Sequence, residues 1–191
     1  MIDRTRFLLL AGAVLAAAAC RLLPHPPNFA PVTAMALFAG ATLADRWLAV
    51  VVPLAAMLLS DLALGILRQG DPLAAFHGLV PVVYGSLAAI VGLGMLLRGR
   101  RRVVPVFIAT LAASLLFFAV TNLAVWALTP SWPGTLAGLV ACYTAALPFL
   151  HHALAGDLFF AALLFGGLAL AERRALLPTD PLSRAPGSRA P

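Results

Sequence analysis

The stretch Arg98-Gly99-Arg100-Arg101-Arg102 places four arginines among five residues, between two long apolar runs. The chain around it is 62% hydrophobic. In membrane proteins, short loops rich in Lys or Arg stay on the cytoplasmic side, because moving fixed positive charge across a bilayer is costly. We therefore expect this loop to lie in the cytoplasm, and its position sets the direction of every other span.

The composition excludes an ordinary soluble domain. Only 10% of the 191 residues are charged, whereas soluble domains carry about 25%. Apolar runs long enough to cross a hydrocarbon core of about 30 Å recur along the chain. The 13 basic residues lie at the ends of these runs and in the tail, so they form no continuous face for nucleic acid. We expect one transmembrane domain over residues 1–174 and a disordered cytoplasmic tail over 175–191.

The apolar pattern predicts an all-α membrane protein with six transmembrane helices and both termini in the cytoplasm. Only Arg21 and Arg68 then lie at the outer side, while the other arginines before the tail lie inside. This asymmetry is typical of membrane topology. The expected spans are about Phe7–Leu23, Val32–Leu43, Leu48–Leu67, His77–Leu97, Val103–Leu128 and Ala153–Ala171.

Two segments have alternative interpretations. Gly134–Leu150 is apolar enough for a helix, but it contains Pro148, and a full crossing would place Glu172-Arg173-Arg174 outside. We expect a re-entrant or interfacial outer segment here, which requires other parts of the protein to cover its backbone. The first span also resembles a signal peptide ending near Cys20. We expect a retained helix, with cleavage as the alternative.

Polar residues within the spans gather near the outer ends. Asp61, Asn122 and Asp157 lie about 8–10 Å deep at 1.5 Å per residue, and Tyr84 lies at a similar depth. Ionisable groups inside a membrane usually face a bundle interior or an aqueous cavity. We expect an outward-facing polar pocket; the alternative is that the carboxylates only stabilise helix contacts. The expected lining is Asn28, Asp61, His77, Tyr84, Asn122 and Asp157.

Histidine suggests metal binding, because imidazole is a common transition-metal ligand. His77, at the mouth of the fourth span, is the candidate ligand. His151 and His152 are adjacent, so on a helix their side chains point about 100° apart and would rarely share one ion.

One pair of residues has the spacing of an enzyme motif. His152 and Asp157 match the His-x4-Asp spacing of glycerolipid acyltransferases, in which the aspartate orients a histidine base. The chain has no Walker loop, Gly-x-Ser-x-Gly elbow or His-Glu-x-x-His helix. We therefore expect a protein that is not an enzyme and uses no cofactor.

Short motifs follow one another in order from about residue 24 to residue 170. They are Pro27-Asn28-Phe29-Ala30-Pro31-Val32, Ala36-Leu37-Phe38-Ala39-Gly40, Pro53-Leu54 with Ser60-Asp61, Tyr84-Gly85-Ser86, Phe117-Phe118 with Thr121-Asn122 and Trp126, Gly138-Leu139 with Cys142-Tyr143, Ala146 with Pro148-Phe149, and Gly156-Asp157-Leu158. This set resembles an uncharacterised family of small bacterial membrane proteins that are usually described as candidate transport proteins.

In size, span number and outer pocket the chain is also similar to S components of energy-coupling factor transporters, and most to the solitary cobalamin-uptake proteins. In that group a cysteine in an outer loop can ligate cobalt. The comparable region here offers His77 as the axial ligand of a bound corrinoid. Ala13 and Ala17 are similar to the small-residue face by which S components dock on a transmembrane partner.

The resemblance implies a multi-pass protein of the bacterial inner membrane that takes up a vitamin or related micronutrient, with cobalamin the leading candidate. It also implies transmembrane and ATPase partner subunits. Two hypotheses from other classes are a lipid acyltransferase-like enzyme using His152 and Asp157, and a membrane scaffold protein without a small ligand.

Overall fold

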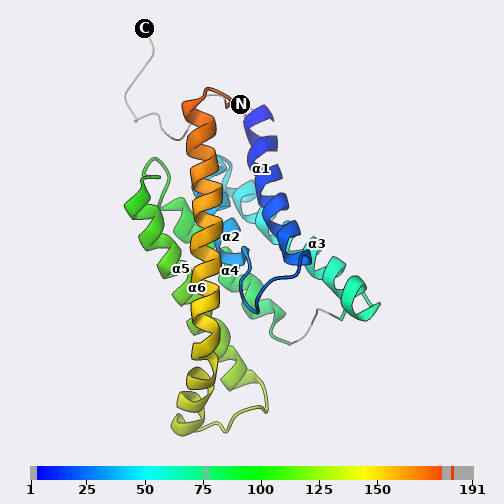
Figure 1. Cartoon of the computed structure of the whole chain (residues 1–191). Helices are drawn as coiled ribbons and strands as arrows, with labels where there is room; N and C mark the ends of the chain where they lie inside the picture. Colours follow the sequence, from blue (N-terminus) through cyan, green and yellow to red (C-terminus); the bar gives the residue numbers. More distant parts are fainter. Residues whose placement is uncertain (1–3, 75, 77, 178–181, 183–191) are drawn as a thin grey trace.

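The computed structural model describes residues 4–74, 76, 78–177 and 182, and over these residues the protein is all-helical (Figure 1). The expected all-α class is therefore confirmed. The helices are α1 (Arg4–Ala19), a short 3₁₀ turn η1 (Cys20–Leu22), α2 (Val32–Thr42), α3 (Arg46–Gln69), α4 (Val80–Met95), α5 (Val103–Leu128) and α6 (Leu136–Arg173).

Four of these segments are long and apolar enough to cross a membrane: α1 together with η1, α3, α5 and α6. The other two expected spans are shorter. With 11 and 16 residues, α2 and α4 measure only about 16 and 24 Å at 1.5 Å per residue. A hydrocarbon core is about 30 Å thick, so neither of these helices crosses it fully as a straight rod.

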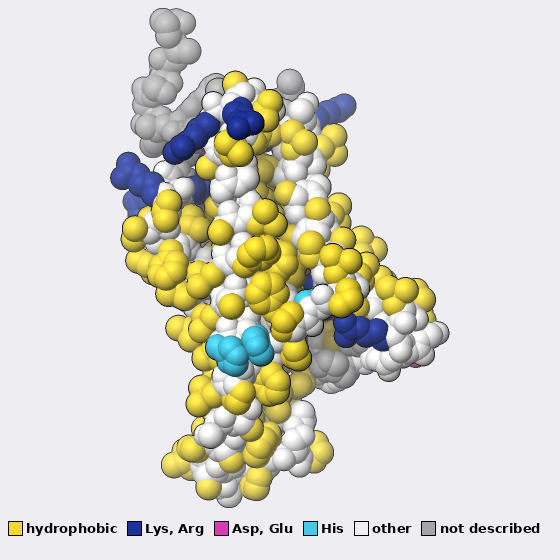
Figure 2. Space-filling view, viewed as in Figure 1, with side chains coloured by type: hydrophobic (Ala, Val, Ile, Leu, Met, Phe, Trp, Pro, Cys, Tyr) yellow, Lys and Arg dark blue, Asp and Glu magenta, His cyan; other side chains and the backbone are white. Residues whose placement is uncertain are grey.

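The start of α1 and the end of α6 lie together at one end of the bundle (Figure 1). An ion pair of 2.6 Å joins Arg6 of α1 to Glu172 of α6, and Arg101 lies 3.5 Å from the same carboxylate. Basic side chains surround this end on the face shown in Figure 2. We call it the arginine end. The positive-inside rule predicts that it is cytoplasmic.

The first helix is packed into the bundle. It contacts α2 and α3, and its side chains Leu10, Val14 and Ala18 are buried. Loss of residues 1–19 would expose the surfaces that these side chains cover. Retention of this helix, with cleavage as the alternative, stays a prediction.

The short helix α2 is the centre of the structure and contacts each of the other five α-helices. Every residue from Thr33 to Thr42 is buried. Phe38, Met35 and Leu37 have almost no exposed surface. A helix end leaves backbone groups without intrahelical partners. Because α2 ends inside the protein, other parts of the chain must satisfy both of its ends.

Two glycines allow α2 and α4 to touch through their backbones. A Cβ atom built on Gly40 would lie 2.1 Å from the carbonyl oxygen of Val91, and one built on Gly94 would lie 2.3 Å from that of Leu37. Small residues permit this close approach of helices in membranes. The crossing therefore fixes α2 against α4.

Arg98, from the arginine cluster, satisfies the carboxyl end of α2. Its Nε donates to the carbonyl of Gly40 at 3.0 Å, and a terminal nitrogen donates to that of Leu43 at 2.8 Å. Cations are favourable at helix carboxyl ends. Burial lowers the pKa of Arg98, and the nearby Arg46 acts in the same direction while Asp45 opposes them. Arginine nevertheless stays charged at neutral pH.

Replacing Arg98 with glutamine is expected to destabilise the protein by about 1–3 kcal/mol, because buried carbonyls lose charged donors. Arg100→Gln is the matched control, since Arg100 is exposed in the same loop. Unfolding of both variants in detergent would measure the difference. Equal stabilities would show that Arg98 does not cap α2.

The expected re-entrant or interfacial segment over Gly134–Leu150 is not separate from the last span. Residues 136–173 form one continuous helix, with Pro148 inside it. The helix begins at an N-cap, where the hydroxyl of Thr135 accepts from the Gly138 N–H at 3.1 Å. Proline is tolerated within such helices when neighbouring groups satisfy the freed carbonyl. At 38 residues, α6 is about 57 Å long, and its first half forms a hairpin with α5 beyond the other helices (Figure 1).

A polar cavity at the amino end of α2

The loop before α2 lies directly against α6. A Cβ built on Gly156 would lie 3.1 Å from the backbone of Phe29 and Ala30, so a glycine permits this contact. Asn28 adopts a positive φ of 63°, a conformation that asparagine tolerates better than most residues. The loop ends at Pro31, which is the N-cap of α2 and supplies no side-chain hydrogen bond.

Asp157 of α6 supplies the missing cap. Its carboxylate is almost fully buried and accepts a 2.6 Å hydrogen bond from the hydroxyl of Ser114 on α5. The backbone N–H groups of Thr33 and Ala34, in the first turn of α2, also interact with it. A helix amino end carries a partial positive charge and unsatisfied N–H donors, so a carboxylate is stabilised there.

Beside this carboxylate lies a partly enclosed cavity of about 200 Å³, between the loop before α2, α2 itself, α5 and α6. One part of its wall is polar and the rest is apolar, with three phenylalanines. The polar members are Asn28, Thr33, Ser114, Thr121, Asn122 and Asp157, and the aromatic members are Phe117, Phe118 and Phe149.

The side-chain amide of Asn122 has hydrogen-bonding groups that its bond within α5 does not use. One N–H of its side-chain amide donates to the carbonyl of Phe118 at 2.8 Å, one turn back on the same helix. An asparagine amide has a second N–H and an oxygen, and this internal bond uses neither. Asp157 and Asn122 therefore place a buried carboxylate and an amide in the wall of one cavity.

Four members of this site were not expected from the sequence, namely Ser114, Phe117, Phe118 and Thr121. A pattern in the sequence could have identified these residues. These residues and Asn122 follow the spacing i, i+3, i+4, i+7 and i+8, which marks one face of a helix. In the otherwise apolar α5, polar side chains at 114, 121 and 122 therefore share a face.

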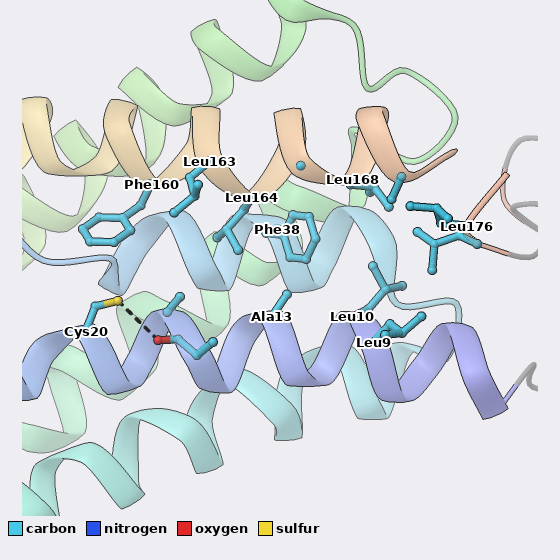
Figure 3. A pocket seen from close by; sticks show the side chains of 15 residues that line it. Leu9, Leu10, Ala13, Cys20, Phe38, Phe160, Leu163, Leu164, Leu168 and Leu176 are labelled. Atoms are coloured by element: carbon cyan, nitrogen blue, oxygen red, sulfur yellow. Dashed lines mark hydrogen bonds between the residues drawn. The ribbon is translucent and has the colours of Figure 1, made fainter. Parts of the chain in front are cut away.

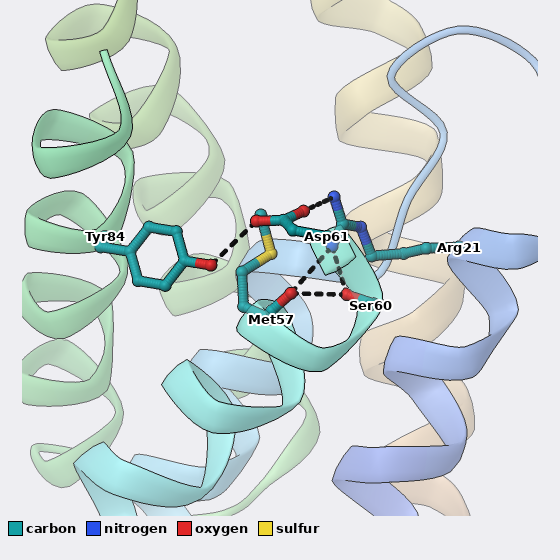
Figure 4. A network of polar contacts seen from close by, with 5 residues as sticks. All are labelled: Arg21, Met57, Ser60, Asp61 and Tyr84. Carbon is teal, nitrogen blue, oxygen red and sulfur yellow. Dashed lines mark hydrogen bonds and ion pairs between the residues drawn. The ribbon is translucent and has the colours of Figure 1, made fainter. Parts of the chain in front are cut away.

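Asp61 and Tyr84 lie elsewhere, in a network that joins three helices (Figure 4). Arg21, in η1, reaches back to Asp61 of α3 with an ion pair of 2.7 Å, and the two side chains are only 13% and 11% exposed. The hydroxyl of Tyr84 on α4 donates to the other carboxylate oxygen at 2.8 Å. Arg21 also donates to the hydroxyl of Ser60 and to the carbonyl of Met57.

The six expected site residues are therefore not all in one place. Asn28, Asn122 and Asp157 line the cavity at the amino end of α2. Asp61 and Tyr84 are not among its lining residues, and the positive charge of Arg21 neutralises Asp61. His77 lies outside the described residues, so its expected role as a cobalt ligand stays a prediction. The division follows from helix packing around α2.

The adjacent histidines contact each other through their rings. The rings of His151 and His152 lie with their centroids 4.0 Å apart. The Nδ1 atom of His152 is buried and has no hydrogen-bond partner in the described part of the chain. The Asp157 carboxylate instead contacts Ser114 and α2. The His–Asp contact on which the acyltransferase hypothesis depends is thus not formed among the described residues, which also include no group of three potential metal ligands.

Comparison with known proteins assigns the chain to a family. Residues 2–181 match DUF6580, which is described as a family of unknown function. The chain belongs to DUF6580. No curated protein and no solved structure matches it. Membership in DUF6580 agrees with the resemblance to an uncharacterised family, and it assigns no substrate and no partner.

Proposed function

We propose that this DUF6580 protein binds a small polar micronutrient in the cavity at the amino end of α2 and takes part in its uptake across the bacterial inner membrane. The observation that carries the proposal is the meeting of a buried carboxylate, a helix amino end and a side-chain amide in one cavity of an apolar bundle. Ionisable groups at membrane depth commonly mark substrate or ion pathways.

The half-length helix α2 supports the same proposal. In several transporter folds, discontinuous helices end near the membrane midplane and direct their dipoles at the substrate. Here α2 is too short to span, and its amino end lies at the wall of the cavity through Thr33. An internal carboxylate already balances that end, so a ligand that donates hydrogen bonds suits the site better than an anion.

The size of the cavity restricts the ligand. Its 200 Å³ corresponds to roughly seven water molecules at about 30 Å³ each. Ordinary small-molecule pockets hold about 300–1,000 Å³. We therefore propose a micronutrient smaller than cobalamin, bearing an amine or hydroxyl group that can donate to Asp157 and a face that packs on phenylalanine.

Filling the cavity tests this proposal. Ala146 lines the cavity, whereas its neighbour Ala145 is exposed outside it. Overpacking costs about 1–3 kcal/mol, so Ala146→Leu is expected to reduce the amount of bound solute by roughly tenfold. Ala145→Leu is expected to bind normally. Asp157→Asn should lower binding while preserving the shape of the cavity.

The measurement is mass spectrometry of small molecules that copurify with the full chain in mild detergent. A compound enriched in the wild-type and Ala145→Leu proteins, and depleted in the other two, would support the proposal. Identical profiles in all four proteins would contradict it. Acyl transfer to a lipid that is abolished by His152→Ala would favour the enzyme instead.

A further inference from the structure

A second and larger cavity shares no lining residue with the polar site. It is a groove of about 510 Å³ between α1 and α6, with Phe38 of α2 at its base. Figure 3 shows that Cys20 and Phe160 lie at one end, and that Leu9, Leu10 and Leu176 lie at the other. Its lining consists of Leu9, Leu10, Ala13, Ala16, Ala17, Cys20, Phe38, Phe160, Leu163, Leu164, Gly167, Leu168, Ala171, Leu176 and Leu177.

The length of the groove matches one leaflet of a bilayer. Its lining on α1 extends from Leu9 to Cys20, and on α6 from Phe160 to Ala171. Each stretch is about 16 Å long at 1.5 Å per residue. Half of a hydrocarbon core is about 15 Å. The length of the groove is therefore about equal to the thickness of the hydrocarbon layer that the acyl chains of one leaflet occupy.

The groove is narrow for a helix. A volume of 510 Å³ over that length gives a mean cross-section of about 30 Å², less than that of a helix about 10 Å or more in diameter, so a helix would lie over the groove and not within it. An extended hydrocarbon chain is narrow enough to fit. The lining has no charged side chain, as an acyl chain requires.

The end of the groove near Leu9 and Leu176 is also the arginine end. Arg4, Arg173 and Arg174 are exposed there, and the ion pair between Arg6 and Glu172 joins α1 to α6 beside them. Glu172 is the one acidic side chain among these described groups, and Arg6 and Arg101 both contact it. The surplus positive charge lies where the headgroup of a lipid in the groove would be.

We propose that this groove is a binding site for an anionic glycerophospholipid. One acyl chain lies between α1 and α6, and the phosphate contacts the exposed arginines. Anionic lipids attract basic residues near the membrane surface. The site occupies the face on which the resemblance to S components predicts partner docking through Ala13 and Ala17, so the two occupants compete.

Two adjacent glycines of α6 provide the test. Gly167 lines the groove and Gly166 does not, and a Cβ on either would meet nothing within 4 Å. Gly167→Leu is expected to displace methylene groups of the chain and to weaken lipid binding by roughly tenfold. Gly166→Leu is expected to bind as the wild type does, and thermal unfolding would verify that both variants are folded.

The readout is native mass spectrometry of the full chain, after reconstitution with equal amounts of phosphatidylglycerol and phosphatidylcholine. The wild-type protein and Gly166→Leu should retain one phosphatidylglycerol in preference to phosphatidylcholine. Arg4→Gln, Arg173→Gln and Arg174→Gln should each reduce this preference by about fivefold. Neither Gly167→Leu nor any of the three arginine substitutions should alter the binding of a solute in the cavity at α2.

Three results would overturn the proposal. One is equal retention of the two lipids by the wild-type protein. Another is unchanged retention of phosphatidylglycerol by folded Gly167→Leu. The third is a protein helix that crosslinks to a cysteine placed at position 167 and excludes lipid, which would establish partner docking instead.

Discussion

Gly94→Ala is expected to unfold this protein or to leave it severely destabilised, whereas Gly92→Ala, two residues earlier on the same helix, is expected to be tolerated. The added Cβ at position 94 would lie 2.3 Å from a backbone carbonyl of α2, and no rotamer change relieves a clash with backbone. Separating α2 from α4 would loosen the most buried helix of the fold. We expect a loss of about 3 kcal/mol or more.

Gly92 is a sharp control for this prediction. It is exposed on α4, and a Cβ there would meet nothing within 4 Å. Alanine is a better helix former than glycine by about 1 kcal/mol, so the control is expected to be neutral or stabilising. Chemical unfolding in detergent would compare the two variants. Equal stability of the two variants would show that the backbones of α2 and α4 do not meet at these glycines.

The second large effect is expected at the network of Arg21, Asp61 and Tyr84. Asp61→Leu would leave the guanidinium of Arg21 and the hydroxyl of Tyr84 without the carboxylate that both contact. Removing one partner of a buried ion pair costs about 3–5 kcal/mol. We expect a loss of this size, because the network joins η1, α3 and α4.

The double variant Arg21→Met with Asp61→Leu separates the loss of an interaction from the burial of an unpaired charge. Replacing both partners of a buried pair by apolar residues is often neutral, so most of the lost stability should return. Arg68→Met, at an exposed position of α3, serves as the control for removing an arginine. A double variant as unstable as Asp61→Leu would contradict this account.

Much of the fold could be predicted from apolar pattern and charge. The expected span at 103–128 has the observed bounds of α5. Arginines from the start of α1, from the loop before α5 and from the end of α6 gather at one end. Hydropathy does not show which apolar helix lies at the centre, however. The burial of α2 depends on Gly40 and Gly94, and on the charged side chains of Asp157 and Arg98, which cap its two ends. These two capping residues come from distant parts of the chain.

The re-entrant segment was expected because of Pro148 and because a full crossing would place Glu172-Arg173-Arg174 outside, and neither feature prevents a continuous helix here. Within a long helix, a proline removes one backbone hydrogen bond, and packing against α5 can maintain the helix around it. The contacts of Tyr143 and Cys142 with carbonyls of α5 show this packing. The local sequence around Pro148 does not indicate these contacts with α5.

For the candidate site, only the depth of the polar residues in the membrane could be predicted. Counting residues from the span ends places Asp61, Asn122 and Asp157 at similar levels in the membrane, but it does not give their angular positions around the bundle. Arg21 was assigned to the outer surface, yet its long side chain extends inward to Asp61. A carboxylate expected to face a ligand therefore faces an internal cation.

The proposed uptake function requires that the cavity beside Asp157 be open to solution on the side opposite the arginine end. Cysteine labelling tests it directly, in a chain whose Cys20 and Cys142 have been replaced by alanine. With cysteine at position 122, a membrane-impermeant maleimide added to intact spheroplasts should react, and the added Ala146→Leu substitution should slow the reaction. Labelling at position 122 only after the cells are opened, or only after denaturation, would contradict the proposal.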